Sequence, residues 1–252
     1  MNDVTVPTLQ MLPPADGVAR AAVLLLHGLD MAPQTLAPFV RTLRLPAWVA
    51  LSAAPLARPG GGRAWWPVDD AARALRLASG PSDFAAMDPP GRAAARACVR
   101  EALAALRARA GPGVPLAVAG FSQGAMLALD ALLVDDDVAG EGAVAGDGER
   151  PAACGVDALM LWSASRLAYD RWAPHLSRLR GMPVQQLHGR RDANLGLAAG
   201  ESLRDALVAA GARMEWVAFD GGHEIPLAAW VGLRRWVREA GEGAGGAAAG
   251  AR

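Results

Sequence analysis

The sequence predicts an α/β fold in which helices cover both faces of a mostly parallel central sheet. Short apolar runs bounded by turn residues alternate with longer segments of helical periodicity, as they do when strands and helices alternate along a chain. The chain has 252 residues, of which 52% are hydrophobic, so it can bury one large core. We therefore expect one domain over residues 1–240, followed by a Gly/Ala-rich disordered tail over residues 241–252.

Each expected strand is a short apolar run, and each expected helix is a longer segment between two such runs. The helix over residues 88–109 has Asp88 as its expected N-cap, Pro89 and Pro90 in its first turn, and Gly111 at its end. The expected strands span residues 21–26, 47–51, 114–119, 156–162, 183–187 and 213–219. The expected helices span residues 33–43, 88–109, 123–134, 197–210 and 226–239.

Composition argues against several classes of protein. The longest apolar run, residues 21–26, is too short to cross a bilayer, so no integral membrane association is expected. Basic and acidic residues number 25 each, which argues against a nucleic-acid partner. The two cysteines, Cys98 and Cys154, are too few for a disulfide framework or a cysteine-rich metal site, and we expect buried thiols.

Two further segments carry expectations about location and surface. The first residues lack the positive and apolar regions of a cleaved signal peptide, so a cytoplasmic location is expected. Acidic residues among Gly and Ala over residues 135–155 indicate a solvated surface loop.

A Gly-x-Ser-x-Gly motif lies where an expected strand passes into an expected helix. Gly120-Phe121-Ser122-Gln123-Gly124 follows the strand over residues 114–119 directly. Small flanking residues permit a sharp turn that projects the serine Oγ above the sheet, near the positive end of the following helix. This context favours Ser122 as a nucleophile; the alternative is a Gly-rich turn with an incidental serine.

A serine nucleophile needs a general base and a carboxylate that orients the base. Asp192 follows the strand over residues 183–187, and His223 follows the strand over residues 213–219, so both lie on loops at the sheet edge where Ser122 sits. Two alternatives stay open for the acid: Asp192 could cap the next helix, and Asp220 is a rival acid near His223. His223 could also be structural.

The remaining histidines fit packing or hydrogen-bonding roles better than catalysis. His27 and His188 each end a strand in a His-Gly pair, and His175 is expected to be a surface or packing residue.

Acyl transfer also requires donors aimed at the developing oxyanion. One donor at such a turn is the N–H of the residue after the nucleophile, here Gln123. The second comes from a loop after an early strand, and Leu29 in the segment 27–30 is the candidate. The alternative for that segment is an ordinary strand-ending turn.

Four segments together resemble the phospholipase/carboxylesterase family, which includes the acyl-protein thioesterases. They read Leu24-Leu25-Leu26-His27-Gly28-Leu29-Asp30, Gly120-Phe121-Ser122-Gln123-Gly124-Ala125-Met126, Leu187-His188-Gly189-Arg190-Arg191-Asp192 and Gly221-Gly222-His223-Glu224-Ile225. The resemblance covers residues 21–236 and implies the α/β-hydrolase fold. It also implies a Ser122, Asp192 and His223 triad acting on carboxylic esters or thioesters, with acyl chains on proteins and lysophospholipids among the substrates.

Trp65 and Trp66 lie in the loop region after the second strand, where the amino-acid sequence departs from the pattern of that family. They are candidates for substrate binding as a hydrophobic wall of an acyl pocket, or else they anchor the loop to the core.

The sequence thus predicts a serine hydrolase that acts through an acyl-enzyme, without metal or organic cofactor. Its expected partner is a small-molecule ester or thioester, with an acylated protein as a further candidate; the oligomeric state is not indicated. The alternatives are a lysophospholipase, a transferase that passes the acyl group to an alcohol, and a non-catalytic ligand-binding protein of the same fold.

Overall fold

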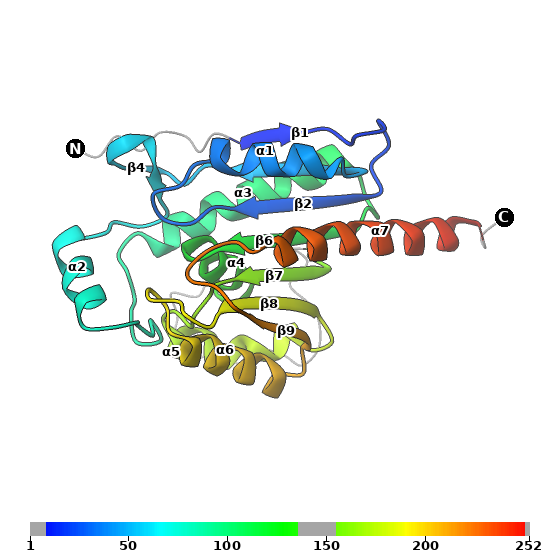
Figure 1. Ribbon diagram of the computed structural model, residues 1–252. Helices are drawn as coiled ribbons and strands as arrows, with labels where there is room; N and C mark the ends of the chain where they lie inside the picture. Colours follow the sequence, from blue (N-terminus) through cyan, green and yellow to red (C-terminus); the bar gives the residue numbers. More distant parts are fainter. Residues whose placement is uncertain (1–8, 136–154, 250–252) are drawn as a thin grey trace.

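The computed structural model describes residues 9–135 and 155–249, and within them a seven-stranded sheet forms the centre of the molecule (Figure 1). The strand order is β1-β3-β2-β6-β7-β8-β9, in which β1 is antiparallel to β3 and all other neighbours are parallel. The strands are β1 (Leu9–Leu12), β2 (Ala21–Leu26), β3 (Ala47–Ser52), β6 (Leu116–Phe121), β7 (Ala158–Trp162), β8 (Pro183–Gly189) and β9 (Arg213–Phe219). This arrangement confirms the predicted fold class.

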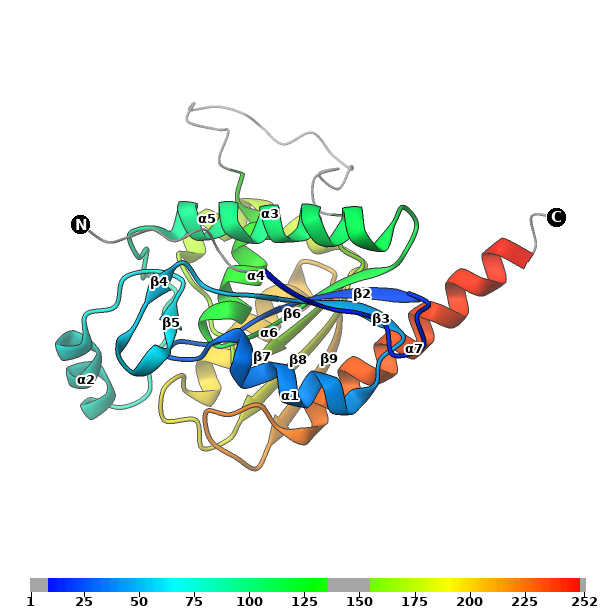
Figure 2. The ribbon, with the colours of Figure 1, turned by 90° about the horizontal axis from the view of Figure 1, so that it is seen from above.

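Helices cover both faces of the sheet, as Figure 2 shows from above. The apolar side chains of α1 (Pro33–Leu43) and α7 (Leu227–Ala249) form one core with one face. Those of α3 (Arg92–Ala110), α4 (Gln123–Leu133) and α6 (Leu197–Ala209) form the other core, together with α5 (Tyr169–Trp172) and the 3-10 helix η2 (Ala173–Leu179). Every residue of α4 is buried, so this helix lies inside the molecule. None of the helices in the described ranges is long and apolar enough to cross a membrane.

The strands and helices of the main sheet agree closely with the sequence-based prediction. β2, β9 and α1 have the predicted bounds, β8 ends two residues later than predicted, and β6 both begins and ends two residues later than predicted. The helix predicted from Asp88 begins instead at Arg92, after Gly91 as its N-cap. The N-cap prediction for Asp88 is wrong, because its carboxylate accepts a hydrogen bond from Arg92 Nε at 2.9 Å.

Several elements were not predicted. They are β1, the hairpin of β4 (Leu56–Ala57) and β5 (Arg63–Ala64), the 3-10 turn η1 (Pro59–Gly61), α5, η2, and α2 (Asp70–Ala78). The helix α7 runs to Ala249, whereas a disordered tail was expected from Gly241. Extending an existing helix adds one backbone hydrogen bond for each residue fixed, so the helix can continue through glycines where a new helix would not begin. The acidic loop lies outside the described residues between 136 and 154, as does Cys154; Cys98 is partly rather than fully buried.

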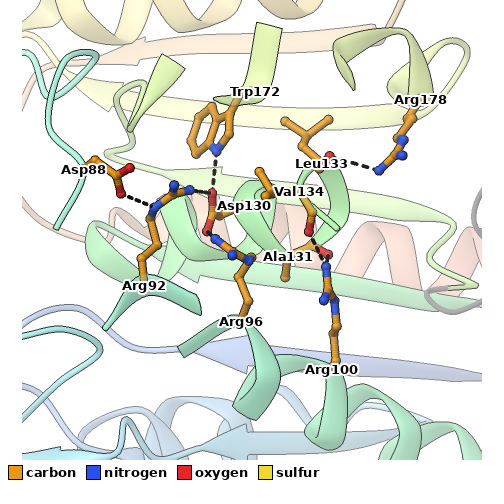
Figure 3. Close-up of polar contacts among 10 residues, drawn as sticks. All are labelled: Asp88, Arg92, Arg96, Arg100, Asp130, Ala131, Leu133, Val134, Trp172 and Arg178. Carbon is orange, nitrogen blue, oxygen red and sulfur yellow. Dashed lines mark hydrogen bonds and ion pairs between the residues drawn. The ribbon is translucent and has the colours of Figure 1, made fainter. Parts of the chain in front are cut away.

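A buried cluster of charges ties α4 to its neighbours (Figure 3). Asp130, in the middle of α4, is fully buried and accepts hydrogen bonds from Arg92, from Arg96 Nη1 at 2.8 Å and from Trp172 Nε1 at 2.6 Å. Arg92 also donates to Asp88. Several charge-assisted hydrogen bonds to one carboxylate offset the cost of removing it from water. The cluster therefore fixes α3 and α5 against α4.

Removing the Asp130 carboxylate should destabilise the protein strongly. In Asp130→Ala, two buried guanidinium groups lose their shared acceptor, and we expect the free energy of unfolding to fall by about 3–5 kcal/mol. The matched control is Asp135→Ala, which removes an exposed ion pair with Arg178 and should cost about 1 kcal/mol or less. Urea unfolding measures both values. Equal losses in the two variants would contradict the role assigned to the buried cluster.

Candidate active site

Ser122 occupies a sharp turn between β6, which ends at Phe121, and α4, which begins at Gln123. Its backbone has φ 53° and ψ −118°, a conformation that side-chain-bearing residues rarely adopt. The turn is held by a hydrogen bond from Ser122 N–H to the carbonyl of Trp162 at 2.9 Å on the neighbouring strand. The strained turn presents the serine at the carboxyl end of the sheet.

Steric constraints explain why glycine occupies both glycine positions of the motif. A Cβ at Gly120 would lie 2.6 Å from the backbone nitrogen of Ala125, inside the first turn of α4. A Cβ at Gly124 would lie 2.4 Å from the carbonyl oxygen of Leu26, at the end of β2. Both contacts involve backbone atoms, so no side chain fits at either position and the turn requires glycine there.

Hydrogen bonds connect Ser122, His223 and Asp192 in a chain. His223, on the loop between β9 and α7, has its Nε2 2.9 Å from Ser122 Oγ. Its Nδ1 lies 2.7 Å from Asp192 Oδ2, on the loop after β8. When Nδ1 donates to the carboxylate, Nε2 is left as an acceptor for the serine hydroxyl. The structure thus brings together the three residues that the sequence predicts as a triad.

Asp192 has a buried carboxylate that accepts several hydrogen bonds. Only 4% of the residue is exposed, and this burial raises its pKa. The hydrogen bonds from His223 and from the N–H groups of Leu195 and Asn194 outweigh burial, so the pKa lies below its usual value. Asp192 is therefore ionised at neutral pH, and it both faces His223 and caps the following turn. The rival acid, Asp220, is exposed and pairs with Arg191 instead.

The loop after β2 brings Leu29, one of the two predicted oxyanion donors, to the cleft that contains Ser122 and the second predicted donor, Gln123. Leu29 and Gln123 line the cleft that contains Ser122, and no hydrogen bond among the described residues uses the N–H of either. The loop is fixed by hydrogen bonds from Asp30 N–H to the Arg63 carbonyl and from Arg63 N–H to the Met31 carbonyl, each 2.9 Å. Two backbone donors therefore stay available beside the serine.

His27 supports this loop from below. Its Nδ1 donates to the Gly28 carbonyl at 2.7 Å, and its Nε2 accepts from Ala54 N–H at 3.0 Å. The ring is fully buried, and burial lowers its pKa to about 4. The predicted packing and hydrogen-bonding role is confirmed, and it requires the neutral ring.

The two tryptophans have different positions. Trp66 lines the cleft, as one of the two interpretations expected. Trp65 does not line it, so its assignment to substrate binding is wrong: the ring is 1% exposed and packs 5.3 Å from the His27 ring. Its Nε1 donates to the His27 carbonyl at 2.8 Å, and its N–H donates to Gln123 Oε1 at 3.2 Å. Trp65 is thus an anchor between β2 and the turn at Ser122.

The cleft has a volume of about 490 Å³ and is covered by residues that the sequence did not indicate. Its lining includes Ser122 and His223 together with residues of α2 and of the segment 82–90. The sequence does carry a signal for α2, because its apolar side chains recur on one face of the helix and Asp69 is its N-cap, so periodicity could have found it. Within the described ranges, no group of three or more His, Cys, Asp or Glu side chains could hold a metal ion.

The fold is that of an α/β-hydrolase. No protein-family model matches the sequence, and no curated protein matches it. Solved structures do. Esterase PE8 superposes with a TM-score of 0.70 and 24% identity over 93% of this chain and 99% of its own.

Two further matches have similar coverage. They are acyl-protein thioesterase 2 of Zea mays (TM-score 0.66, 21% identity, 93% of this chain, 99% of that chain) and a carboxylesterase from Mesorhizobium loti (TM-score 0.65, 17% identity, 94% and 97%). At these identities the likeness shows a shared fold, which is the fold of thioesterase- and carboxylesterase-like α/β-hydrolases.

The buried neutral His27 should make the fold sensitive to acid. Because its pKa is lowered to about 4 in the folded state, the unfolded chain binds the proton first as pH falls. The stability that His27 contributes is complete above about pH 6.5 and decreases by about 3 kcal/mol as pH falls to about 4. His27→Asn should remove this pH dependence, whatever its cost at neutral pH.

Urea unfolding of wild type and His27→Asn at a series of pH values tests this. The control is His175→Asn. Burial lowers the pKa of His175 as well, but this histidine is partly exposed and lies outside the core. Parallel stability curves for wild type and His27→Asn would show that His27 is not the group responsible.

Proposed function

We propose that this protein is a serine hydrolase that cleaves carboxylic esters or thioesters through an acyl-enzyme. The observation that carries the proposal is the hydrogen-bonded chain from Ser122 through His223 to the buried Asp192, at the floor of a cleft with two unused backbone donors. The names of the structural neighbours, an esterase, a thioesterase and a carboxylesterase, support the same class.

In the proposed acylation step, Ser122 Oγ attacks the acyl carbonyl carbon while His223 Nε2 takes the hydroxyl proton. Asp192 keeps Nδ1 protonated and stabilises the imidazolium that forms. The carbonyl oxygen becomes an oxyanion that the N–H groups of Leu29 and Gln123 hold. His223 then gives its proton to the leaving alcohol or thiol, and the acyl group stays on Ser122.

In the proposed deacylation step, a water molecule takes the place of the leaving group beside His223. His223 accepts a proton from this water as it attacks the ester carbonyl, and then returns the proton to Ser122 Oγ. The products are the free acid and the regenerated serine. The apolar part of the cleft, which includes Trp66, Phe84 and Met87, fits a hydrocarbon portion of the substrate.

Ser122→Ala should abolish turnover and leave the fold intact. We expect wild type to hydrolyse p-nitrophenyl acetate, butyrate, octanoate or palmitate, with a chain-length optimum set by the cleft, and the variant to lose at least about 10³-fold in kcat. Release of p-nitrophenolate measures the rates, and thermal unfolding checks the fold. Full activity in the variant would refute the nucleophile. Failure of wild type to react with a fluorophosphonate, while binding acyl ligands, would instead indicate a non-catalytic binding protein.

Asp192→Asn should lower kcat by about 10³–10⁴-fold, because an asparagine cannot hold His223 in the required tautomer. The matched control is Asp220→Asn, which removes the nearby exposed carboxylate and should change kcat by less than about threefold. Hydrolysis of p-nitrophenyl butyrate measures both rates. A larger loss in Asp220→Asn than in Asp192→Asn would transfer the acid role to Asp220.

A further inference from the structure

Two arginines of α2 line the cleft that contains Ser122 and His223. Arg73 and Arg76 are both partly buried, and the Arg76 guanidinium lies over the ring of Phe84, with its carbon 5.7 Å from the ring centre. Among the residues that the structure describes, no carboxylate lies within ion-pair distance of either guanidinium. Two guanidinium groups that form no ion pair thus form part of the wall of an otherwise mainly apolar cleft, and the Arg73 charge helps to lower the pKa of its acidic neighbour Asp70.

The carboxylates near these arginines have other partners. Asp69, which lines the cleft, accepts a hydrogen bond from Ala72 N–H at 3.0 Å as the N-cap of α2. Asp88, which also lines it, accepts from Arg92 at 2.9 Å. Asp70 forms an ion pair with Arg58 at 2.5 Å. The guanidinium donors of Arg73 and Arg76 therefore stay available to a molecule in the cleft.

Resting on the proposed function, we infer that the preferred substrate carries an anionic group, a carboxylate at the far end of its acyl part, which Arg73 and Arg76 bind. Guanidinium groups match the geometry of carboxylates, and the pairing strengthens where water is partly excluded. Leu77, Phe84 and Met87 supply apolar surface in the same cleft for the methylene groups between the two ends of the acyl part. The substrate class is a half-ester, or half-thioester, of a dicarboxylic acid.

A second hollow explains why the anion is assigned to the acyl part. It has a volume of about 260 Å³, touches His223 but not Ser122, and is lined mostly by apolar residues such as Phe39 and Trp230, together with Thr35 and the carboxylate residue Glu224. Because His223 protonates the leaving group, the leaving alcohol or thiol lies on the His223 side, next to this hollow. The acyl part then takes the cleft with the arginines. The competing interpretation is that the anionic group bound by the arginines belongs to the alcohol part of the substrate, for example as a phosphate.

The test compares monoethyl adipate with ethyl hexanoate, which share a leaving group and differ in a terminal carboxylate. We expect wild type to favour monoethyl adipate, and Arg73→Gln and Arg76→Gln each to lower the ratio of the two kcat/KM values on the order of tenfold. The control is Arg171→Gln, which removes the same charge at an exposed position of α5 and should leave the ratio unchanged. A ratio that is unchanged in the cleft variants would overturn the inference.

A second pair places the anion on the leaving group: 4-acetoxybenzoate against phenyl acetate. If the arginine variants lower the preference only in this pair, the assignment to the acyl part is wrong. If they lower it only in the adipate pair, the inference is supported as stated. Ethanol release and phenol release measure the two pairs.

Binding to Ser122→Ala separates this inference from the proposed function. Calorimetry should show tighter binding of monoethyl adipate than of ethyl hexanoate, with the difference lost when Arg73→Gln is added. If wild type hydrolyses none of the esters but this binding difference is found, the proposed function fails and the anion site stands. Equal binding of the two esters would remove the anion site, whatever the activity.

Discussion

The contact between the first turn of α4 and the end of β2 is the constraint on which the site depends. Gly124 lies so close to the carbonyl of Leu26 that no side chain fits between them. This approach places Ser122 beside the loop that carries Leu29, and at the same sheet edge as the loops of Asp192 and His223. One backbone contact thus sets the distance between Ser122 and the N–H of Leu29, a proposed oxyanion donor that belongs to a segment far from Ser122 in the sequence.

The strain at Ser122 is supported by a helix that cannot shift easily. α4 is buried on all sides, and its one central charge, Asp130, is held by donors from α3 and α5. A positive φ costs on the order of 1–3 kcal/mol and persists only where the surroundings fix it. Packing of an all-buried helix and a directional polar cluster together meet that requirement.

Order along the chain was enough to predict that Ser122, Asp192 and His223 meet, because carboxyl ends of parallel strands share one edge and each of the three follows such a strand. The buried strands and α1 could be predicted for a similar reason, since their apolar patterns are strong. Trp65 could not be placed, because an anchor and a pocket wall use the same residue type. The strands β4 and β5 have only two residues each, which is too short to leave a pattern. The helix α2 does have an amphipathic pattern and an N-cap in Asp69, and both signals were missed. Asp88 was misplaced because a cap and an ion pair also look alike in sequence.

The helix α2, which lines the cleft, and the helix α4, which begins directly after Ser122, differ in local stability. α2 has no buried residue, and its first turn is attached to the oxyanion loop through Arg58, which bridges Asp70 at 2.5 Å and Asp30 at 2.8 Å. Such exposed ion pairs are weak and are screened by salt, whereas α4 opens only with the whole domain. Backbone amides of α2 will therefore exchange with solvent through local opening, and those of α4 only through global unfolding. α2 can therefore rearrange around bound molecules of different shape, while Ser122 at the start of α4 keeps its position.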